Sequence, residues 1–128
     1  MVPVQLTLRN FMSYGEDVPP LDFTLFHVAC LSGNNGHGKS ALLDAITWTI
    51  WGEARKRAGA RKADEGLLRI GTTEMRTELV FDLEGDRYRI IRNYRKSRSA
   101  GVCTLEFQLY DDSAAGYIPL SESASVTQ

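Results

Sequence analysis

One eight-residue stretch constrains this chain more than any other. Residues 33–40 read G-N-N-G-H-G-K-S and match the G-x-x-x-x-G-K-S pattern of a phosphate-binding loop. Its glycines allow successive backbone N–H groups to converge on phosphate oxygens. Lys39 would supply positive charge to the β- and γ-phosphates and is the predicted catalytic residue, and the Ser40 hydroxyl suits Mg²⁺. The predicted phosphate site consists of Gly33, Asn34, Asn35, Gly36, His37, Gly38, Lys39 and Ser40.

The segments on either side of this loop fit the motif. Residues 27–32 are a short apolar run typical of a strand buried on both faces. Residues 41–51 have helical length and are apolar nearly all round, which predicts a buried helix that begins at Ala41 and ends at Gly52. Because the helix directs its positive end at the bound anion, strand, loop and helix together predict an α/β phosphate site.

The remaining pattern predicts strands. Residues 4–9 alternate apolar and polar side chains, and residues 21–25 form a second strand after a turn with two prolines. Residues 77–83, 87–94 and 102–110 alternate clearly, with a hairpin turn at 84–86, so we expect an antiparallel meander. The tail from 111 to 128 shows no terminating element. We therefore expect one domain, residues 1–128, of the α/β class.

Composition excludes some classes of protein. The chain has 128 residues, 43% of them hydrophobic and 24% charged, as in ordinary globular domains. It contains no apolar run long enough to span a membrane. Cys30 and Cys103 lie in predicted strands and indicate reduced core residues of a cytoplasmic protein. His27 and His37 have no metal-ligand spacing.

The net charge of −1 hides two basic windows, 55–69 and 87–98, which hold twelve of the fifteen Lys and Arg. Such clusters either contact nucleic acid phosphates or form solvated loops, and the sequence leaves both interpretations open. The candidates for DNA contact are Arg55, Lys56, Arg57, Arg61, Lys62, Arg95, Lys96 and Arg98.

Hydrolysis needs more than a phosphate loop, because an acid must hold the metal and a polar group must activate water. Asp82 ends an apolar run but precedes a hairpin turn, so we interpret it as part of an ordinary meander strand. Trp48 and Trp51 lie at helical spacing, which predicts core packing. The chain therefore has the features of half an ATPase, nearly inactive alone.

These features together resemble the SbcC/Rad-fifty family of DNA-repair ATPases, which are relatives of the ABC and SMC proteins. The similarity covers nearly the whole chain, at residues 6–14, 33–46, 51–52, 62–65, 80–81 and 87–92. It implies the N-terminal lobe of an ABC-type head, completed by a C-terminal lobe beyond a coiled coil. It further implies two heads that enclose ATP and Mg²⁺, an SbcD/Mre-eleven-type nuclease, DNA double-strand ends as substrate, and a nucleoid-associated location.

The resemblance also implies nucleotide contacts outside the loop. Residues after Phe11, namely Met12 and Ser13, and the segment with Arg69 and Ile70 would approach ribose and adenine. Many relatives carry a basic residue in place of Met12 and a second Ser or Thr in place of Ala41. Ala41 would therefore contribute only its backbone.

Two other functions compete with a repair ATPase. An SMC- or RecF-type clamp would use ATP to close a head dimer on DNA without a nuclease. A small-molecule P-loop kinase is disfavoured because such enzymes usually continue after the loop with helix and parallel strand.

Overall fold

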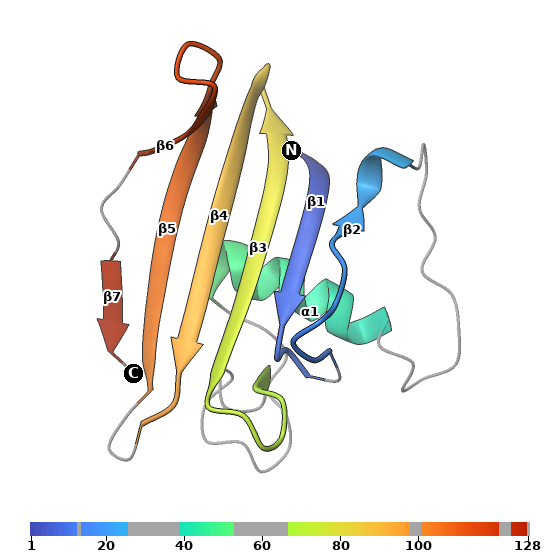
Figure 1. Cartoon of the computed structure of the whole chain (residues 1–128), viewed down its shortest axis with the longest axis vertical. Helices are drawn as coiled ribbons and strands as arrows, with labels where there is room; N and C mark the ends of the chain where they lie inside the picture. Colours follow the sequence, from blue (N-terminus) through green and yellow to red (C-terminus); the bar gives the residue numbers. More distant parts are fainter. Residues whose placement is uncertain (13, 26–38, 53–66, 98–100, 121–123, 128) are drawn as a thin grey trace.

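The computed structural model describes residues 1–12, 14–25, 39–52, 67–97, 101–120 and 124–127. A seven-stranded sheet dominates, in the order β2-β1-β3-β4-β5-β6, with β7 also paired to β5. All strand pairs are antiparallel. The helix α1 lies across one face of this sheet (Figure 1). The expected buried strand at 27–32 and loop residues 33–38 fall outside the described residues.

The first strand, β1 (Val2–Arg9), confirms the alternating pattern and pairs with both β2 and β3. The strand expected at 21–25 is only partly correct. β2 covers Leu21–Asp22, and a 3₁₀ turn follows at Phe23–Leu25. The Asp22 carboxylate accepts hydrogen bonds from both the N–H (2.9 Å) and the hydroxyl (2.6 Å) of Thr24, which favours a turn over continued extension. These bonds lower the pKa of Asp22.

The predicted meander is confirmed as β3 (Glu74–Leu83), β4 (Asp86–Arg95) and β5 (Val102–Asp111). Glu84 and Gly85 connect the first two strands with φ angles of 52° and 87°. Two consecutive positive φ angles define the tight turn that matches the twist of a hairpin. The sequence signal is sufficient here because alternation and turn residues agree.

The expectation that the tail has no terminating element is wrong. Two short strands, β6 (Gly116–Pro119) and β7 (Ala124–Thr127), pair with the two halves of the free edge of β5. Both have only four residues, which is too short for a periodic pattern to stand out in the sequence. Both strands form because they pair with the backbone of β5. Pairing with a distant strand leaves no periodic pattern in the sequence.

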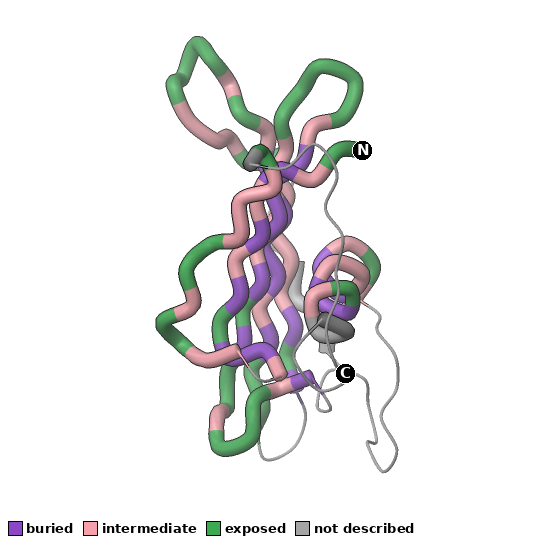
Figure 2. The backbone as a smooth tube through the Cα atoms, turned by 90° about the vertical axis from the view of Figure 1, so that its right-hand side faces the viewer, coloured by how far each residue is buried: buried purple, intermediate pink, exposed green. Residues whose placement is uncertain are grey.

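The helix α1 (Lys39–Trp51) begins two residues earlier than expected. It ends as predicted at Gly52, which has a φ of +73° and donates its N–H to the Trp48 carbonyl at 2.7 Å. Trp48 is fully buried, as predicted, but Trp51 is 67% exposed, so its assignment to the core is wrong. A single sheet covers only one side of the helix, as the edge-on view in Figure 2 shows.

The hydrophobic core lies between α1 and the sheet. Alternate side chains of the strands point toward the helix, so that face of the sheet is apolar; its buried members include Leu6, Leu8, Met75, Leu79, Phe81, Ile90, Tyr94 and Cys103. Cys103 is buried, as expected of a core residue, whereas Cys30 lies outside the described residues. No helix in the described ranges is long and apolar enough to cross a membrane.

Candidate functional site

The predicted phosphate loop leads directly into α1, since Lys39 is the first helical residue. Lys39, Ser40 and Ala41 form the first turn of the helix, and this turn contains no acidic residue. The positive end of the helix dipole is therefore not neutralised by a carboxylate of its own first turn. A lysine, a serine and a helix N-terminus are a donor set that fits a phosphate group with its Mg²⁺.

The two stretches expected near ribose and adenine lie against each other. The Met12 N–H donates to the Leu67 carbonyl at 2.6 Å, and the Arg69 N–H donates to the Asn10 carbonyl at 2.9 Å. Phe11 forms a β-bridge with Leu68. Asn10 and Met12 adopt positive φ angles of 53° and 52°, which makes this turn tight.

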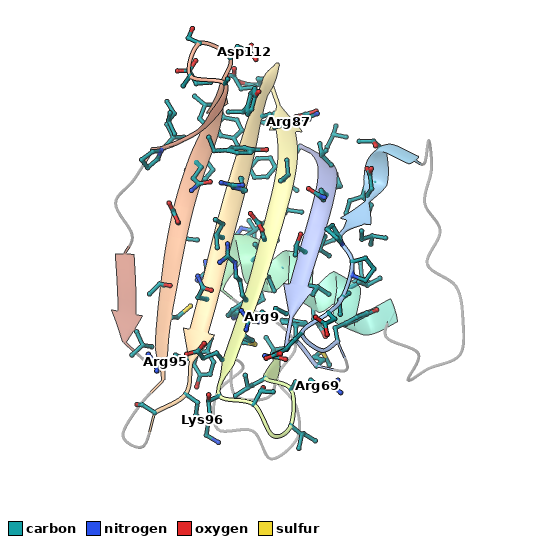
Figure 3. The ribbon with its side chains drawn as sticks, in the orientation of Figure 1. Arg9, Arg69, Arg87, Arg95, Lys96 and Asp112 are labelled. Carbon is teal, nitrogen blue, oxygen red and sulfur yellow. The ribbon has the colours of Figure 1, made fainter. Side chains whose placement is uncertain are left out.

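This paired unit is anchored to α1. The Phe11 ring is fully buried, with its centroid 6.0 Å from that of Trp48, and Leu67 is buried beside them. Ile70 is 99% exposed, and Arg69 is also exposed at the lower end of the molecule (Figure 3). Ser13 lies outside the described residues. The roles of Met12, Arg69 and Ile70 toward a nucleotide stay predictions.

Among the described residues, the Asp82 side chain bonds to the neighbouring strand β4. It lies in β3, where Arg87 Nε and Nη2 donate to its two oxygens at 2.8 and 3.1 Å. The hydrogen bond from Arg87 lowers the pKa of Asp82, and the same bond raises the pKa of Arg87. The interpretation of Asp82 as an ordinary strand residue is therefore confirmed.

The face of the sheet turned away from α1, which we call the outer face, carries several cations. Arg9 of β1 lies directly opposite Arg76 of β3, and Arg95 ends β4. A hollow of about 560 Å³ on this face is lined by these three arginines together with the outer-face side chains Glu74, Asn93, Val102 and Thr104. Arg9, Arg95 and Lys96 occupy the lower half of the molecule in Figure 3.

Carboxylates offset part of this charge. Glu74 lies 3.2 Å from Arg95, and Glu16 lies 3.6 Å from Arg9, with every side chain of the two pairs more than half exposed. Exposed pairs of this kind are weak and can be replaced by other ligands. Sequence reasoning missed Arg9 and Arg76, because only the register of β1 against β3 brings them together.

The other predicted DNA contacts cannot be placed in this way. Of the eight candidates, the described residues include only Arg95 and Lys96. The remaining positions, Arg55, Lys56, Arg57, Arg61, Lys62 and Arg98, fall outside the described residues.

Comparisons with known proteins bear on this arrangement. A family model described as an AAA domain matches residues 5–114. The chain is 34% identical over 96 residues to a probable DNA double-strand break repair Rad50 ATPase of Aquifex aeolicus, covering 75% of this chain and 10% of the relative. It is 38% identical over 106 residues to the SbcC component of the nuclease SbcCD of Deinococcus radiodurans, covering 83% of this chain and 11% of the relative.

The chain thus spans about a tenth of the length of these relatives. The family match nevertheless covers most of the chain, including the phosphate loop, α1 and the meander. The chain belongs to the AAA domain family, as an N-terminal ATPase-head fragment of the SbcC/Rad50 type.

Proposed function

We propose that this chain binds ATP through Gly33 to Ala41, with Ser40 as a ligand of Mg²⁺ and Lys39 on the β- and γ-phosphates. The observation that supports this most strongly is that the last two residues of the G-x-x-x-x-G-K-S motif, Lys39 and Ser40, are the first two residues of α1. When bound, Mg²⁺ would neutralise charge that develops on the phosphate oxygens. The paired unit at Met12 and Arg69 would hold the ribose and adenine.

Hydrolysis would require a C-terminal lobe joined to this one, and we call the two together the assembled head. α1 supports this because its outward side is apolar, with Leu43 58% and Trp51 67% exposed. A helix that is apolar all round is normally buried on all sides. The relatives are also about ten times longer than this chain, so they contain material that could cover that side.

The cellular role we propose is the processing of DNA double-strand ends by two assembled heads together with an SbcD/Mre-eleven-type nuclease. The names of the relatives support a repair ATPase and a nuclease complex. A clamp without a nuclease is less well supported, because the SbcCD relative is named as part of a nuclease.

A test of ATP binding compares Lys39→Ala and Ser40→Ala in the assembled head by titration calorimetry, with Mg²⁺ and with EDTA. Losing Lys39 should weaken nucleotide binding under both conditions, because it removes charge from the phosphates. Losing Ser40 should weaken mainly the Mg²⁺-dependent part. Binding that survives Lys39→Ala unchanged would contradict the proposed site.

The same preparation tests the proposal that the catalytic groups are shared between this chain and a C-terminal lobe. This chain alone should hydrolyse ATP negligibly, while the assembled head should turn it over. Turnover by the isolated chain that disappears in Lys39→Ala would show that it already contains a complete catalytic set.

A further inference from the structure

Polar side chains buried between α1 and the sheet gather around one helical residue, Thr49. Thr49 and Thr77 are fully buried, and Arg92 is only 8% exposed. Thr77 of β3 and Arg92 of β4 are direct cross-strand partners, so their side chains stand next to each other on the helix-facing side. Neighbouring strands therefore present two polar groups to a single turn of α1.

The contacts converge on both the backbone and the side chain of Thr49. Arg92 Nε donates a hydrogen bond to the Thr49 carbonyl at 3.2 Å. The hydroxyl oxygens of Thr49 and Thr77 are hydrogen-bonded at 2.6 Å. The Thr49 hydroxyl also lies 2.5 Å from the Ala45 carbonyl, so it is held within its own helix as well.

Gly52 makes room for the Arg92 guanidinium at the C-terminal end of α1. A Cβ atom added to Gly52 would lie 3.0 Å from Arg92 Nη1, and the φ of +73° at this position also favours glycine. The same Nη1 contacts the Cys103 sulfur at 3.5 Å, and the guanidinium carbon lies 5.8 Å from the Trp48 ring centroid. The carbonyl groups at a helix C-terminus favour a cation.

An apolar side chain could fill this space at lower desolvation cost, since a buried charge is expensive unless it is well bonded. Arg92 differs from an apolar side chain because it forms a directional hydrogen bond with the helix. Apolar packing of Ala45 and Trp48 is non-directional and permits small slides or rotations of a helix. Hydrogen bonds have narrow distance and angle ranges, so they hold the helix at one position along and around its axis.

We propose that Arg92, Thr77 and Thr49 form a polar clasp that fixes α1 on the sheet and thereby positions Lys39 and Ser40 for the nucleotide phosphates. These three are positioning residues that act through the helix. The inference rests on the proposed function, because it takes the N-terminal end of α1 as the phosphate site. That end lies toward the β2 edge of the sheet, and the clasp holds the opposite half of the helix (Figure 1).

A helix rises about 1.5 Å per residue, so the clasp at Thr49 acts roughly 15 Å from Lys39 along a rigid element. Without the clasp, a displacement of α1 moves Lys39 and Ser40 together with the rest of the helix. A misplacement of about 1 Å in a catalytic arrangement can lower the rate by about 100-fold.

The test replaces Arg92 by Met in the assembled head, which keeps a long side chain and removes the charge and the hydrogen bond. We expect the variant to fold, MgATP affinity to fall several-fold, and kcat to fall with it. Arg92→Lys keeps the cation but not the planar guanidinium, and it should recover part of the loss. Nucleotide binding by calorimetry, kcat and KM from ATP turnover, and the thermal midpoint Tm are measured for each.

Arg89→Met is the matched control. Arg89 lies three residues earlier in β4, on the outer face, where Nε donates to Gln108 Oε1 at 2.5 Å and lies 3.4 Å from Glu78. The Arg89→Met substitution therefore disturbs the same strand and a similar polar network on the face of the sheet away from α1. We expect its nucleotide affinity to equal that of the unmodified protein.

Two results would overturn the clasp: a folded Arg92→Met that binds and hydrolyses MgATP normally, or an Arg89→Met with an equal loss. If Arg92→Met does not fold, Thr77→Val tests the clasp instead. This substitution removes the hydrogen bond to Thr49 and keeps a β-branched side chain of similar shape. A folded Thr77→Val should show a smaller loss of affinity, and no loss would refute the proposal. Failure of the clasp can be distinguished from failure of the proposed function. If the proposed ATP site is wrong, Lys39→Ala itself leaves nucleotide binding intact.

Discussion

At the scale of single residues, Gly52 carries two constraints that other glycines in the described part of the chain do not combine. It has a φ of +73°, as the residue after α1, and it faces the Arg92 guanidinium at close range. Gly85 has a similar φ of +87° but nothing within 4 Å of an added Cβ. Comparing the two therefore separates backbone strain from displacement of Arg92.

We predict that Gly52→Ala lowers both stability and nucleotide affinity of the assembled head, whereas Gly85→Ala lowers stability only. The backbone part should be about 1–2 kcal/mol at either site, because a side chain is disfavoured in the left-handed region. Urea unfolding and calorimetric titration with MgATP measure the two quantities. If both substitutions changed nucleotide affinity equally, the displacement of Arg92 by a side chain at position 52 would have no effect of its own on nucleotide binding.

At the scale of the elements, an ion pair joins β3 to β4 near their shared turn. Asp82 and Arg87 are hydrogen-bonded through two atoms each, and the pKa of Asp82 is lowered mainly by that bond. The stability that the pair contributes is fully present above the unfolded-state pKa of about 3.8 and is lost as the pH falls through the lower folded-state pKa.

We predict a coupling free energy of about 0.2–1 kcal/mol between Asp82 and Arg87 at neutral pH, because both side chains are over two-fifths exposed and screened by solvent. A double-mutant cycle with Asp82→Asn and Arg87→Gln, followed by urea unfolding, measures this term. It should vanish at a pH well below 3.8. A coupling that is constant across that range would mean that the charge of Asp82 does not matter.

The elements also show what the sequence alone can predict. β1, α1 and the meander follow from alternation, helical spacing and a glycine turn, all of which are local. The core assignment of Trp51 fails because its exposure depends on what covers the far side of α1. β6 and β7 depend on a free edge of β5, and the meeting of Thr77 with Arg92 depends on register. Pairing partners and register are set by the whole sheet.

At the scale of the whole molecule, the two faces of the sheet have different characters. One packs on α1 next to the candidate phosphate site, and the outer face carries the hollow with Arg9, Arg76 and Arg95. Lys96 follows Arg95 at the end of β4, where its N–H bonds the Thr73 carbonyl at 2.7 Å. The basic residues of the meander turn thus adjoin cations from β1 and β3, although the net charge of the chain is −1.

We predict that duplex DNA bound by the assembled head is held by phosphate contacts from this group, without reading of bases. Each phosphate contact releases counterions, so the logarithm of affinity should fall against the logarithm of salt concentration with a slope of about −0.9 per contact. Arg76→Glu or Arg95→Glu should reduce that slope by about one contact and weaken all sequences alike.

Arg87→Glu serves as the control, because Arg87 lies at the opposite end of β4 and already pairs with Asp82 (Figure 3). Fluorescence anisotropy across a salt series measures affinity and slope for each variant. If the Arg76 and Arg95 reversals change neither quantity, the outer face is a solvated surface. The candidates in the basic window at 55–69, together with Lys96 and Arg98, would then be left to test in the same way.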